Sequence, residues 1–543
     1  MEARRSGPTD TPLLEETIGS NLDRTVAAFP EREALVVRHQ DVRLTYAEFG
    51  RAVDALGRGL LGQGVAVGDR IGIWSPNCAE WVLLQYATAK VGAILVNINP
   101  AYRTSELSYA LRQSGCSMVV AARSYLTSDY EAMIDAVRGD LPDLRDVVYL
   151  DDDRWADMAG GAGGADEAVL AARSSGLSAD QPINIQYTSG TTGFPKGATL
   201  SHHNILNNGF FVGELCGYTP DDRVCIPVPF YHCFGMVLGN LACTTHGAAI
   251  VVPGPGFDPV AVLETVEAER CTSLYGVPTM FIAELGVDDF AGYDLGSLRT
   301  GIMAGSPCPV EVMKRVVADM HMSEVTICYG MTETSPVSTQ TSPADDLERR
   351  VSTVGSVHPH VEVKIVDPET GATVAAGERG ELCTRGYSVM LGYWNDAERT
   401  AEAVDPDGWM HTGDLATMDA DGYVNIVGRI KDMIIRGGEN IYPREIEEYL
   451  YTHPDVVDAQ VVGVPDEKYG EQVAAWIKLQ DGADLSAEDV REYCRESIAH
   501  YKVPAYVLFV DEYPMTVTGK IQKYRLREMA ETALDLAPAA ETA

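Results

Sequence analysis

The chain has 543 residues, with 42 Lys and Arg against 79 Asp and Glu, and a formal net charge of -37. This length exceeds the usual domain size of ~100–200 residues, so the sequence predicts more than one domain. The negative charge excludes a broad nucleic-acid-binding surface and disfavours binding to anionic lipid.

The 11 cysteines stand singly, and the sequence contains no C-x-x-C pair. This pattern favours reduced, buried thiols over a disulfide framework or a zinc site. The N-terminal segment lacks a secretory apolar stretch, and no run of ~18 apolar residues is present that could span a membrane. We therefore expect a soluble, cytoplasmic protein.

Helix and strand patterns alternate in the first half of the chain. Apolar residues recur at helical spacing over 44–63 and 80–90, and strand patterns occupy 70–74 and 91–97. This alternation predicts an α/β fold, with mostly parallel sheets covered by helices. The acidic and glycine-rich stretch 151–167 is expected to form a surface loop.

A strand pattern at 183–187 leads into residues 187–197, which read YTSGTTGFPKG. Glycines let the backbone curl so that several N–H groups face one anion, the hydroxyl groups add donors, and Lys196 adds a positive charge. The spacing differs from the Walker pattern G-x-x-x-x-G-K-[ST]. We interpret the segment as a phosphate-binding loop; the alternative is a flexible hydrophilic linker.

The second half of the chain changes character twice. Short strands and glycine-rich turns over 352–428 predict a β-rich subdomain, and a domain boundary is expected at 428–432. The last residues, 531–543, are rich in Ala, Glu and Pro and are expected to be disordered. Between these regions the patterns predict a compact α+β unit, with helices at 445–450 and 486–498 and strands at 456–464 and 472–479.

The phosphate-loop segment resembles the signature loop of the adenylate-forming superfamily, which includes acyl-CoA synthetases, aryl-CoA ligases, luciferases and peptide-synthetase adenylation domains. The resemblance spans roughly 40–530 and implies a large N-terminal domain, 1–429, and a small mobile C-terminal lid, 430–530. Five further motifs match in the family's order: YGMTE at 329–333, GEL at 380–382 with GYW at 392–394, TGD at 412–414, a hinge segment at 428–447, and TGKI at 518–521.

The resemblance implies a reaction in two halves. A carboxylate attacks the α-phosphorus of ATP to give an acyl-adenylate and pyrophosphate, and the thiol of CoA then attacks the acyl carbon and expels AMP. Both steps build up charge that positioned cations and N–H donors stabilise. The implied ligands are a carboxylic acid, ATP, Mg²⁺ and coenzyme A, without nucleic acid. A homodimer, and a lysine acetyltransferase or deacetylase that acts on Lys520, remain open as partners.

The resemblance assigns the nucleotide to motif residues. Thr332 would bond an α-phosphate oxygen, and Glu333 would bind Mg²⁺, which favours carboxylates together with phosphates. Asp414 would accept the ribose hydroxyl groups with Arg429 beside it. The remaining assignments are the adenine to Gly305, Ser306 and Tyr329, nucleotide binding without a specified group to Gly330 and Met331, and the β- and γ-phosphates to Thr188, Ser189, Gly190, Thr191, Thr192, Gly193 and Lys196.

Two residues are expected to act on the reacting groups. Lys520 lies in a Thr-Gly-Lys turn of the lid and would be the cation of the adenylation step; a free surface lysine is the alternative. His232 lies in an aromatic run and would orient the carboxylate; alone, it would read as a core histidine.

The lid carries the residues that the resemblance assigns to the second half-reaction. Lys431 occupies the family's hinge position, which absorbs large changes in φ and ψ. Gly437 and Gly438 would line the channel of the pantetheine arm. The nucleotide end of CoA would contact Tyr469, Tyr501 and Lys502.

The expected acid is a medium-chain fatty acid. Acetate-specific relatives carry Trp at the position that Gly330 matches, so here the channel is expected to continue past Met331 toward Val337. Its flanking residues are apolar and offer no carboxylate or amide: Phe234, Met236, Val237, Val277 and Met303. The alternatives are an aryl or coumarate-like CoA ligase, an enzyme that loads a carrier protein, and a non-catalytic nucleotide-binding regulator.

Overall fold

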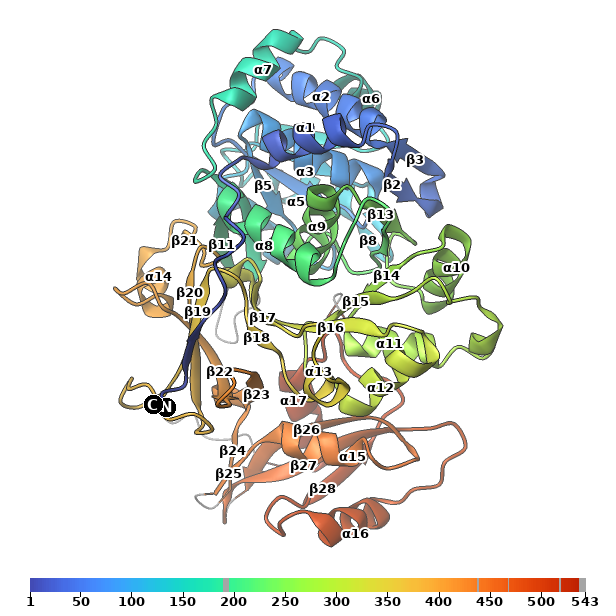
Figure 1. Ribbon diagram of the computed structural model, residues 1–543, viewed down its shortest axis with the longest axis vertical. Helices are drawn as coiled ribbons and strands as arrows, with labels where there is room; N and C mark the ends of the chain where they lie inside the picture. The colour runs from blue at the N-terminus through green and yellow to red at the C-terminus, as the bar shows by residue number, and fades with distance from the viewer. Residues whose placement is uncertain (189–194, 437–438, 467, 517–518, 537–543) are drawn as a thin grey trace.

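The computed structural model describes residues 1–188, 195–436, 439–466, 468–516 and 519–536. Two large sheets and their helices form the N-terminal part of the molecule, a smaller sheet lies beside them, and a C-terminal α+β unit lies at the far end of the long axis (Figure 1). The predicted α/β class is confirmed.

The first sheet has seven strands in the order β21-β11-β10-β5-β4-β6-β9. Its centre is parallel, as the alternating pattern predicts, whereas β11 is antiparallel to β10 and to β21. The strands are Arg70–Trp74 (β4), Ile94–Asn97 (β5), Met118–Ala121 (β6), Asp146–Tyr149 (β9), Pro182–Thr188 (β10), Lys196–Ser201 (β11) and Gly392–Tyr393 (β21).

The second sheet has nine strands in the order β18-β17-β16-β15-β14-β12-β13-β2-β3. It is parallel from β16 to β2 and antiparallel at both ends. The strands are Glu33–Val37 (β2), Val42–Thr45 (β3), Arg223–Cys225 (β12), Ala249–Val252 (β13), Ser273–Gly276 (β14), Thr300–Ala304 (β15), Glu324–Gly330 (β16), Val337–Gln340 (β17) and Ser356–Val357 (β18).

Helices cover both faces of these sheets. In β6, Met118 and Val120 join the core shared by the two sheets, whereas Val119 and Ala121 join the core under α4 and α5, as a strand's period of two requires. Helices α10 to α12 cover the outer face of the second sheet. The helices are Ile18–Ala28 (α1), Tyr46–Gly62 (α2), Ala79–Val91 (α3), Thr104–Ser114 (α4), Tyr130–Arg138 (α5), Asp153–Ala159 (α6), Glu167–Ser175 (α7), His202–Leu215 (α8), Ala242–His246 (α9), Pro259–Glu269 (α10), Pro278–Leu285 (α11), Val310–Asp319 (α12) and Leu347–Ser352 (α13), with a π-helix at Phe234–Leu241.

The prediction of a surface loop over 151–167 is wrong for residues 153–159. Helix α6 occupies Asp153–Ala159, and its buried residues Trp155 and Met158 pack in the core with α2. These two residues are three apart and share one helix face. The acidic and glycine residues around them concealed that short apolar pattern.

The smaller sheet corresponds to the predicted β-rich subdomain, with changes at its edges. Its order is β1-β19-β20-β22-β23, so the N-terminal strand Arg4–Ser6 (β1) completes it. Strands β18 and β21 lie within 352–428 but join the two large sheets. The other members are Val361–Val366 (β19), Gly380–Gly386 (β20), Met410–Met418 (β22) and Val424–Arg429 (β23), and helix α14 spans Ala397–Ala403.

The chain changes sheet between Arg429 and Ile434, through a 3₁₀ turn at Ile430–Asp432. Ser486 and Asp489 form a capping box at the start of α16. Helix α17 continues to Ala533, so the predicted tail does not begin at 531, and 537–543 lie outside the described residues. The C-terminal elements are Ile434–Arg436 (β24), Glu439–Ile441 (β25), Pro443–Leu450 (α15), Val456–Asp466 (β26), Gly470–Leu479 (β27), Ala487–Ser497 (α16), Tyr506–Phe509 (β28) and Lys523–Ala533 (α17).

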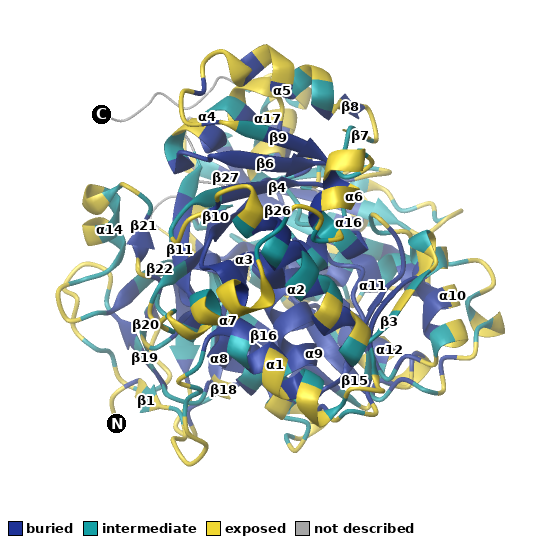
Figure 2. Ribbon diagram, turned by 90° about the horizontal axis from the view of Figure 1, so that it is seen from above, coloured by how far each residue is buried: buried dark blue, intermediate teal, exposed yellow. Residues whose placement is uncertain are grey.

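Burial follows the layers, with the strands of the large sheets enclosed by helices whose outer faces are exposed (Figure 2). All 11 cysteines are free and buried, as their isolated positions predict. Within the described ranges, we find no helix whose length and apolar character would let it cross a bilayer.

Candidate active site

A buried carboxylate, Glu333, lies where the two large sheets meet. It belongs to the 3₁₀ turn Thr332–Thr334 that follows β16, and only 5% of its surface is exposed. Thr188 at the end of β10 donates a hydrogen bond to Glu333 Oε1 over 3.3 Å, and the Tyr393 hydroxyl of β21 donates to the same oxygen over 2.9 Å. This anchored carboxylate suits Mg²⁺, which binds through one or two carboxylates together with phosphates.

The predicted phosphate loop begins and ends beside this carboxylate. Antiparallel pairing places Thr188 opposite Lys196, so the loop starts and finishes at one point of the sheet. The Lys196 Nζ lies 4.9 Å from the centre of the Tyr393 ring. The residues Ser189, Gly190, Thr191, Thr192 and Gly193 lie outside the described residues, so their assignment stays a prediction.

A second carboxylate, Asp414, is held from two sides. The Tyr329 hydroxyl donates to Asp414 Oδ2 over 2.7 Å, and Arg429 Nε donates to Oδ1 over 3.1 Å. Asp414 is 8% exposed, and burial raises its pKa although Arg429 and Tyr329 oppose that shift. The sequence motif thus yields a fixed acceptor, the type of group that recognises paired hydroxyls.

Lys520 enters this site from the C-terminal unit. The Thr279 hydroxyl of α11 donates to the Gly519 carbonyl over 2.9 Å, which fixes the lysine turn against the N-terminal part. Gly305 has a φ of +95°, and a Cβ there would lie 3.3 Å from Lys520 Cε and 3.1 Å from Val277 Cγ1. A residue without a side chain at 305 therefore gives Lys520 room to approach.

The charge of Lys520 is balanced by its surroundings. Burial and the nearby charge of Arg429 together lower its pKa to about 8, and the carboxylates of Asp414 and Glu333 oppose that shift. The three motifs that carry Lys520, Asp414 and Glu333 are more than 80 residues apart in sequence, and the fold gathers them at one site.

His232 is neutral and presents one defined donor. Its Nδ1 accepts a hydrogen bond from the Phe234 N–H over 3.2 Å, so the ring proton is on Nε2. Burial lowers its pKa to about 3, with a further contribution from Lys520. A neutral imidazole with a free Nε2–H can orient a carboxylate by hydrogen bonding.

The residues predicted to bind CoA have other partners in this structure. The Arg436 guanidinium carbon lies 4.3 Å from the centre of the Tyr469 ring, and Lys502 forms an ion pair with Glu445. Tyr501 packs at the edge of the C-terminal core, Lys431 is exposed in the 3₁₀ turn, and Gly437 and Gly438 lie outside the described residues.

The lysine- and arginine-rich segment 500–527 is less cationic than its composition indicates. Lys523 pairs with Glu447 over 2.6 Å, and Arg527 pairs with Glu471 over 2.9 Å. These acids come from other parts of the lid. Among the described residues of this segment, Lys523 and Arg527 are thus paired within the lid, whereas Lys520 enters the site.

The expectation that Gly330 leaves open space for the acyl channel is wrong. A Cβ at Gly330 would lie 1.7 Å from the Pro336 carbonyl oxygen, so this glycine permits a close backbone approach and does not mark open space. A Trp at 330 would therefore collide with the backbone. Met236, one of the residues expected to flank the channel, is buried and contacts two amides, with Asn97 Nδ2 and Gln186 Nε2 lying 3.2 and 3.1 Å from its sulfur.

Sequence reasoning missed three contributors. Tyr393 was visible in the GYW motif, but its bond to Glu333 depends on the pairing of β21 with β11. Thr279 carries no motif signal. Glu381 stands in the GEL motif, and its role emerges only from the hydrogen bonds described below.

Comparison with known proteins places these features in a wider group. A family model described as AMP-binding enzyme matches residues 22–394, and one described as AMP-binding enzyme C-terminal domain matches 445–520. The Bacillus subtilis (strain 168) protein YngI is 51% identical over 95% of this chain and 97% of its own length. The medium-chain acyl-CoA ligase ACSF2 of Danio rerio is 47% identical over 98% and 91%.

A solved structure agrees with the fold over the same extent. The anthranilate CoA ligase AuaEII, in complex with anthranoyl-AMP, superposes with a TM-score of 0.85 at 28% identity. The match covers 97% of this chain and 99% of that chain. Both the N-terminal part and the C-terminal unit therefore have counterparts in one known architecture.

Proposed function

Because the chain belongs to the AMP-binding enzyme family and is an AMP-forming acid–thiol ligase of the acyl-CoA synthetase type, we propose that it activates a medium-chain fatty acid. Its substrates are a carboxylic acid, ATP and CoA. The observation that supports the proposed site is the convergence of Glu333, Asp414 and Lys520 from distant motifs. The name of the zebrafish relative supports the medium chain length.

We propose that the first half-reaction uses these groups as follows. The Nε2–H of His232 orients the acid, whose carboxylate oxygen attacks the α-phosphorus while Lys520 stabilises the charge that develops there. Asp414 and Arg429 hold the ribose, and Tyr329, Gly305 and Ser306 surround the adenine. Glu333 would hold Mg²⁺, which neutralises charge on the phosphates.

For the second half-reaction we propose that the lid, 430–530, rotates against the N-terminal domain, 1–429, about Lys431. The Lys520 turn, docked on Thr279, must leave before CoA can reach the acyl carbon. Gly437 and Gly438 would then line the pantetheine channel, with Tyr469, Tyr501 and Lys502 at the CoA nucleotide. Lys502 would first have to release Glu445.

We also propose a cytoplasmic location, a homodimer and acetylation of Lys520, and each needs its own measurement. The aryl ligase alternative has support among the solved structures, since AuaEII is an anthranilate CoA ligase. ATP–pyrophosphate exchange over a panel of acids, followed by AMP release with CoA or with carrier protein, tests the function and distinguishes the alternatives.

The first expected result concerns chain length. Each buried methylene adds ~0.8 kcal/mol, or about fourfold in kcat/KM, until the channel ends. We expect kcat/KM to rise from C4 and to reach its maximum between about C6 and C12. An optimum at acetate, or a preference for cinnamate over octanoate, would reject the fatty-acid assignment while leaving the adenylation chemistry intact.

The second expected result concerns pH. Lys520 carries its charge below a pKa of about 8 and loses it as the pH rises through that value. The kcat/KM of pyrophosphate exchange for ATP, which reports groups of the free enzyme, should therefore fall about tenfold per pH unit above 8. Lys520→Arg should keep its charge and move this fall to higher pH. An unchanged alkaline fall in that variant would contradict the assignment.

A further inference from the structure

Strand β22 carries an irregularity directly before Asp414. Its neighbour β20 pairs Glu381 with Leu415 and Cys383 with His411, so that Leu382 alone faces the three residues 412–414. Extra residues in one strand interrupt the ladder of hydrogen bonds and redirect the side chains beside them. Gly413 adopts a φ of +71° at this point, which a glycine tolerates.

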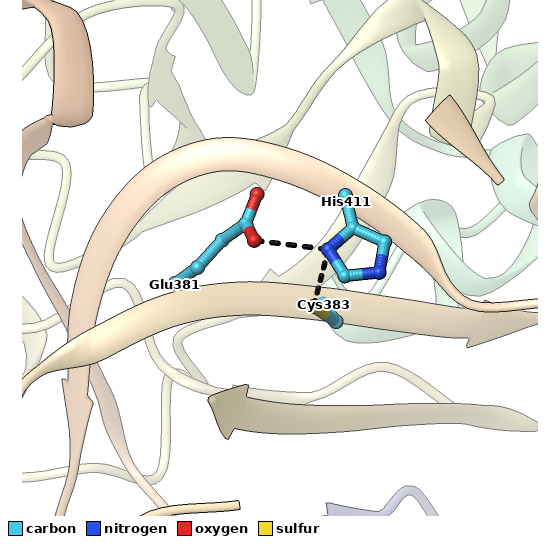
Figure 3. Close-up of side chains that lie close together, drawn as sticks. All are labelled: Glu381, Cys383 and His411. Carbon is cyan, nitrogen blue, oxygen red and sulfur yellow. Dashed lines mark hydrogen bonds and ion pairs between the residues drawn. The ribbon is translucent and has the colours of Figure 1, made fainter. Parts of the chain in front are cut away.

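One side chain stabilises the interrupted backbone. Glu381 Oε1 accepts a hydrogen bond from the Gly413 N–H over 3.0 Å, and Oε2 lies 2.9 Å from His411 Nδ1 (Figure 3). The Thr412 hydroxyl donates to the Leu382 carbonyl over 2.7 Å and lies 3.2 Å from the Asp414 N–H. Glu381 thus binds the two residues that flank Thr412, on the segment leading to Asp414.

These contacts decide where the Asp414 carboxylate lies. Its two oxygens bond to Tyr329 and Arg429, which belong to different strands, β16 and β23. A small change in the preceding backbone would move the carboxylate away from both. A hydrogen bond to an ionised acceptor is stronger than one between neutral groups, so Glu381 is suited to fixing this segment.

We propose that Glu381 is a positioning residue, which holds residues 411–414 so that Asp414 presents its carboxylate to the ribose hydroxyl groups of ATP. The proposal rests on the proposed function, because it concerns the nucleotide that Asp414 receives. Glu381 acts through the Gly413 backbone and His411, without touching the nucleotide itself.

The same residues could be taken for a metal site, because the donor atoms of Glu381, Cys383 and His411 lie within 4.8 Å of one another. The contacts favour positioning. Both oxygens of Glu381 already have partners, and Cys383 is fully buried directly opposite Lys364, a cation, in the sheet. Binding of a divalent cation at these three residues would overturn the proposal.

The test compares ATP with 2′-deoxy-ATP in pyrophosphate exchange, using octanoate as the acid. We expect Glu381→Ala to raise KM for ATP about tenfold, with a smaller change in kcat, and to lower the preference for ATP over 2′-deoxy-ATP by a similar factor. Glu381→Gln keeps an oxygen acceptor for the Gly413 N–H and should restore both values to within about threefold.

The matched control is Glu362→Ala. Glu362 lies on the adjacent strand β19 and pairs with Arg4 and Arg385, so the variant removes two ion pairs from this sheet without altering 411–414. Its preference for ATP should equal that of the wild type. Should Glu381→Ala fail to fold, Glu381→Asp replaces it: the charge remains, the reach shortens, and the preference should fall below that of Glu381→Gln.

The outcomes separate the inference from the function on which it rests. A wild-type enzyme without exchange for any acid overturns the proposed function and, with it, this inference. A wild-type enzyme that prefers ATP, together with a Glu381→Ala variant of equal preference, overturns the inference alone. The positioning role is rejected in favour of a metal site by two results together. Added Zn²⁺ or a zinc-selective chelator shifts the preference of the wild type for ATP over 2′-deoxy-ATP, and Glu381→Gln loses as much of that preference as Glu381→Ala does.

Discussion

Replacing Lys520 with Ala is expected to slow ATP–pyrophosphate exchange by about three decades, while the conversion of supplied acyl-adenylate and CoA to thioester keeps its rate. A cation about 4 Å from developing phosphate charge contributes ~4 kcal/mol at an effective dielectric constant near 20, which corresponds to that factor. In the second half-reaction the thiol attacks the acyl carbon, and AMP leaves with the displaced charge on its phosphate. The proposed rotation of the lid has by then carried Lys520 away, so that step does not depend on this lysine.

The structure gives this prediction a geometric reason. Lys520 reaches the site because Gly519 and Thr279 hold its turn and because Gly305 leaves room for its side chain. The lysine therefore belongs to the docked position of the lid, and a rotated lid would carry it away. Acetylation, which removes the charge, should act like the substitution to Ala.

Single-turnover assays of each half-reaction provide the measurement. Lys523→Ala is the matched control, since Lys523 follows in the same segment but pairs with Glu447 within the lid. Its exchange rate should stay close to that of the wild type, because this largely buried pair lies within the lid and away from the reacting phosphate. Equal losses in both half-reactions of Lys520→Ala would contradict a role confined to adenylation.

Local patterns in the sequence predicted the elements whose residues pack locally. The strand over 70–74 matches β4, because its buried apolar residues and flanking turns lie within one short segment. The helix expected from 44 begins at Tyr46, since residues 42–45 pair with β2 and Thr45 caps the helix. Helical periodicity could not separate these states, because residues 42–45 become extended by pairing with β2 in a hairpin.

At the site, sequence motifs likewise identified some residues, whereas others act through contacts between distant parts of the chain. The motifs identified Glu333, Asp414 and Lys520, whose residue types are fixed by chemistry. They did not identify Thr279, whose contact with Gly519 spans 240 residues. The surroundings of Met236 were hidden for a similar reason, because Asn97 and Gln186 approach its sulfur from other strands of the fold.

Substituting Pro for Lys431 is expected to leave adenylation nearly normal and to reduce the overall CoA-ligase rate about 100-fold. The reason lies in the 3₁₀ turn at Ile430–Asp432, through which the chain passes from β23 to β24. Proline fixes φ near -65°, which is close to the value of a 3₁₀ turn, so the docked lid is retained. Moving away from that value costs ~3 kcal/mol or about two decades of rate.

The contacts that hold the docked lid indicate what rotation must break. Arg379 pairs with Glu445 over 2.9 Å, Arg444 donates to the Ile426 carbonyl over 2.7 Å, and Thr279 bonds to the lysine turn. Each joins the lid to the N-terminal part, and each survives in a variant that cannot rotate. The proline variant should therefore accumulate acyl-adenylate that remains bound.

Quantifying bound acyl-adenylate and released thioester in the same reaction measures both effects. Lys431→Ala is the control, because it removes the side chain while the backbone keeps its freedom, and both half-reactions should proceed normally. If Lys431→Pro makes thioester at the wild-type rate, rotation does not pass through this residue. If it loses adenylation and thioester formation together, the turn supports the docked site, and the hinge must lie elsewhere between β23 and β24.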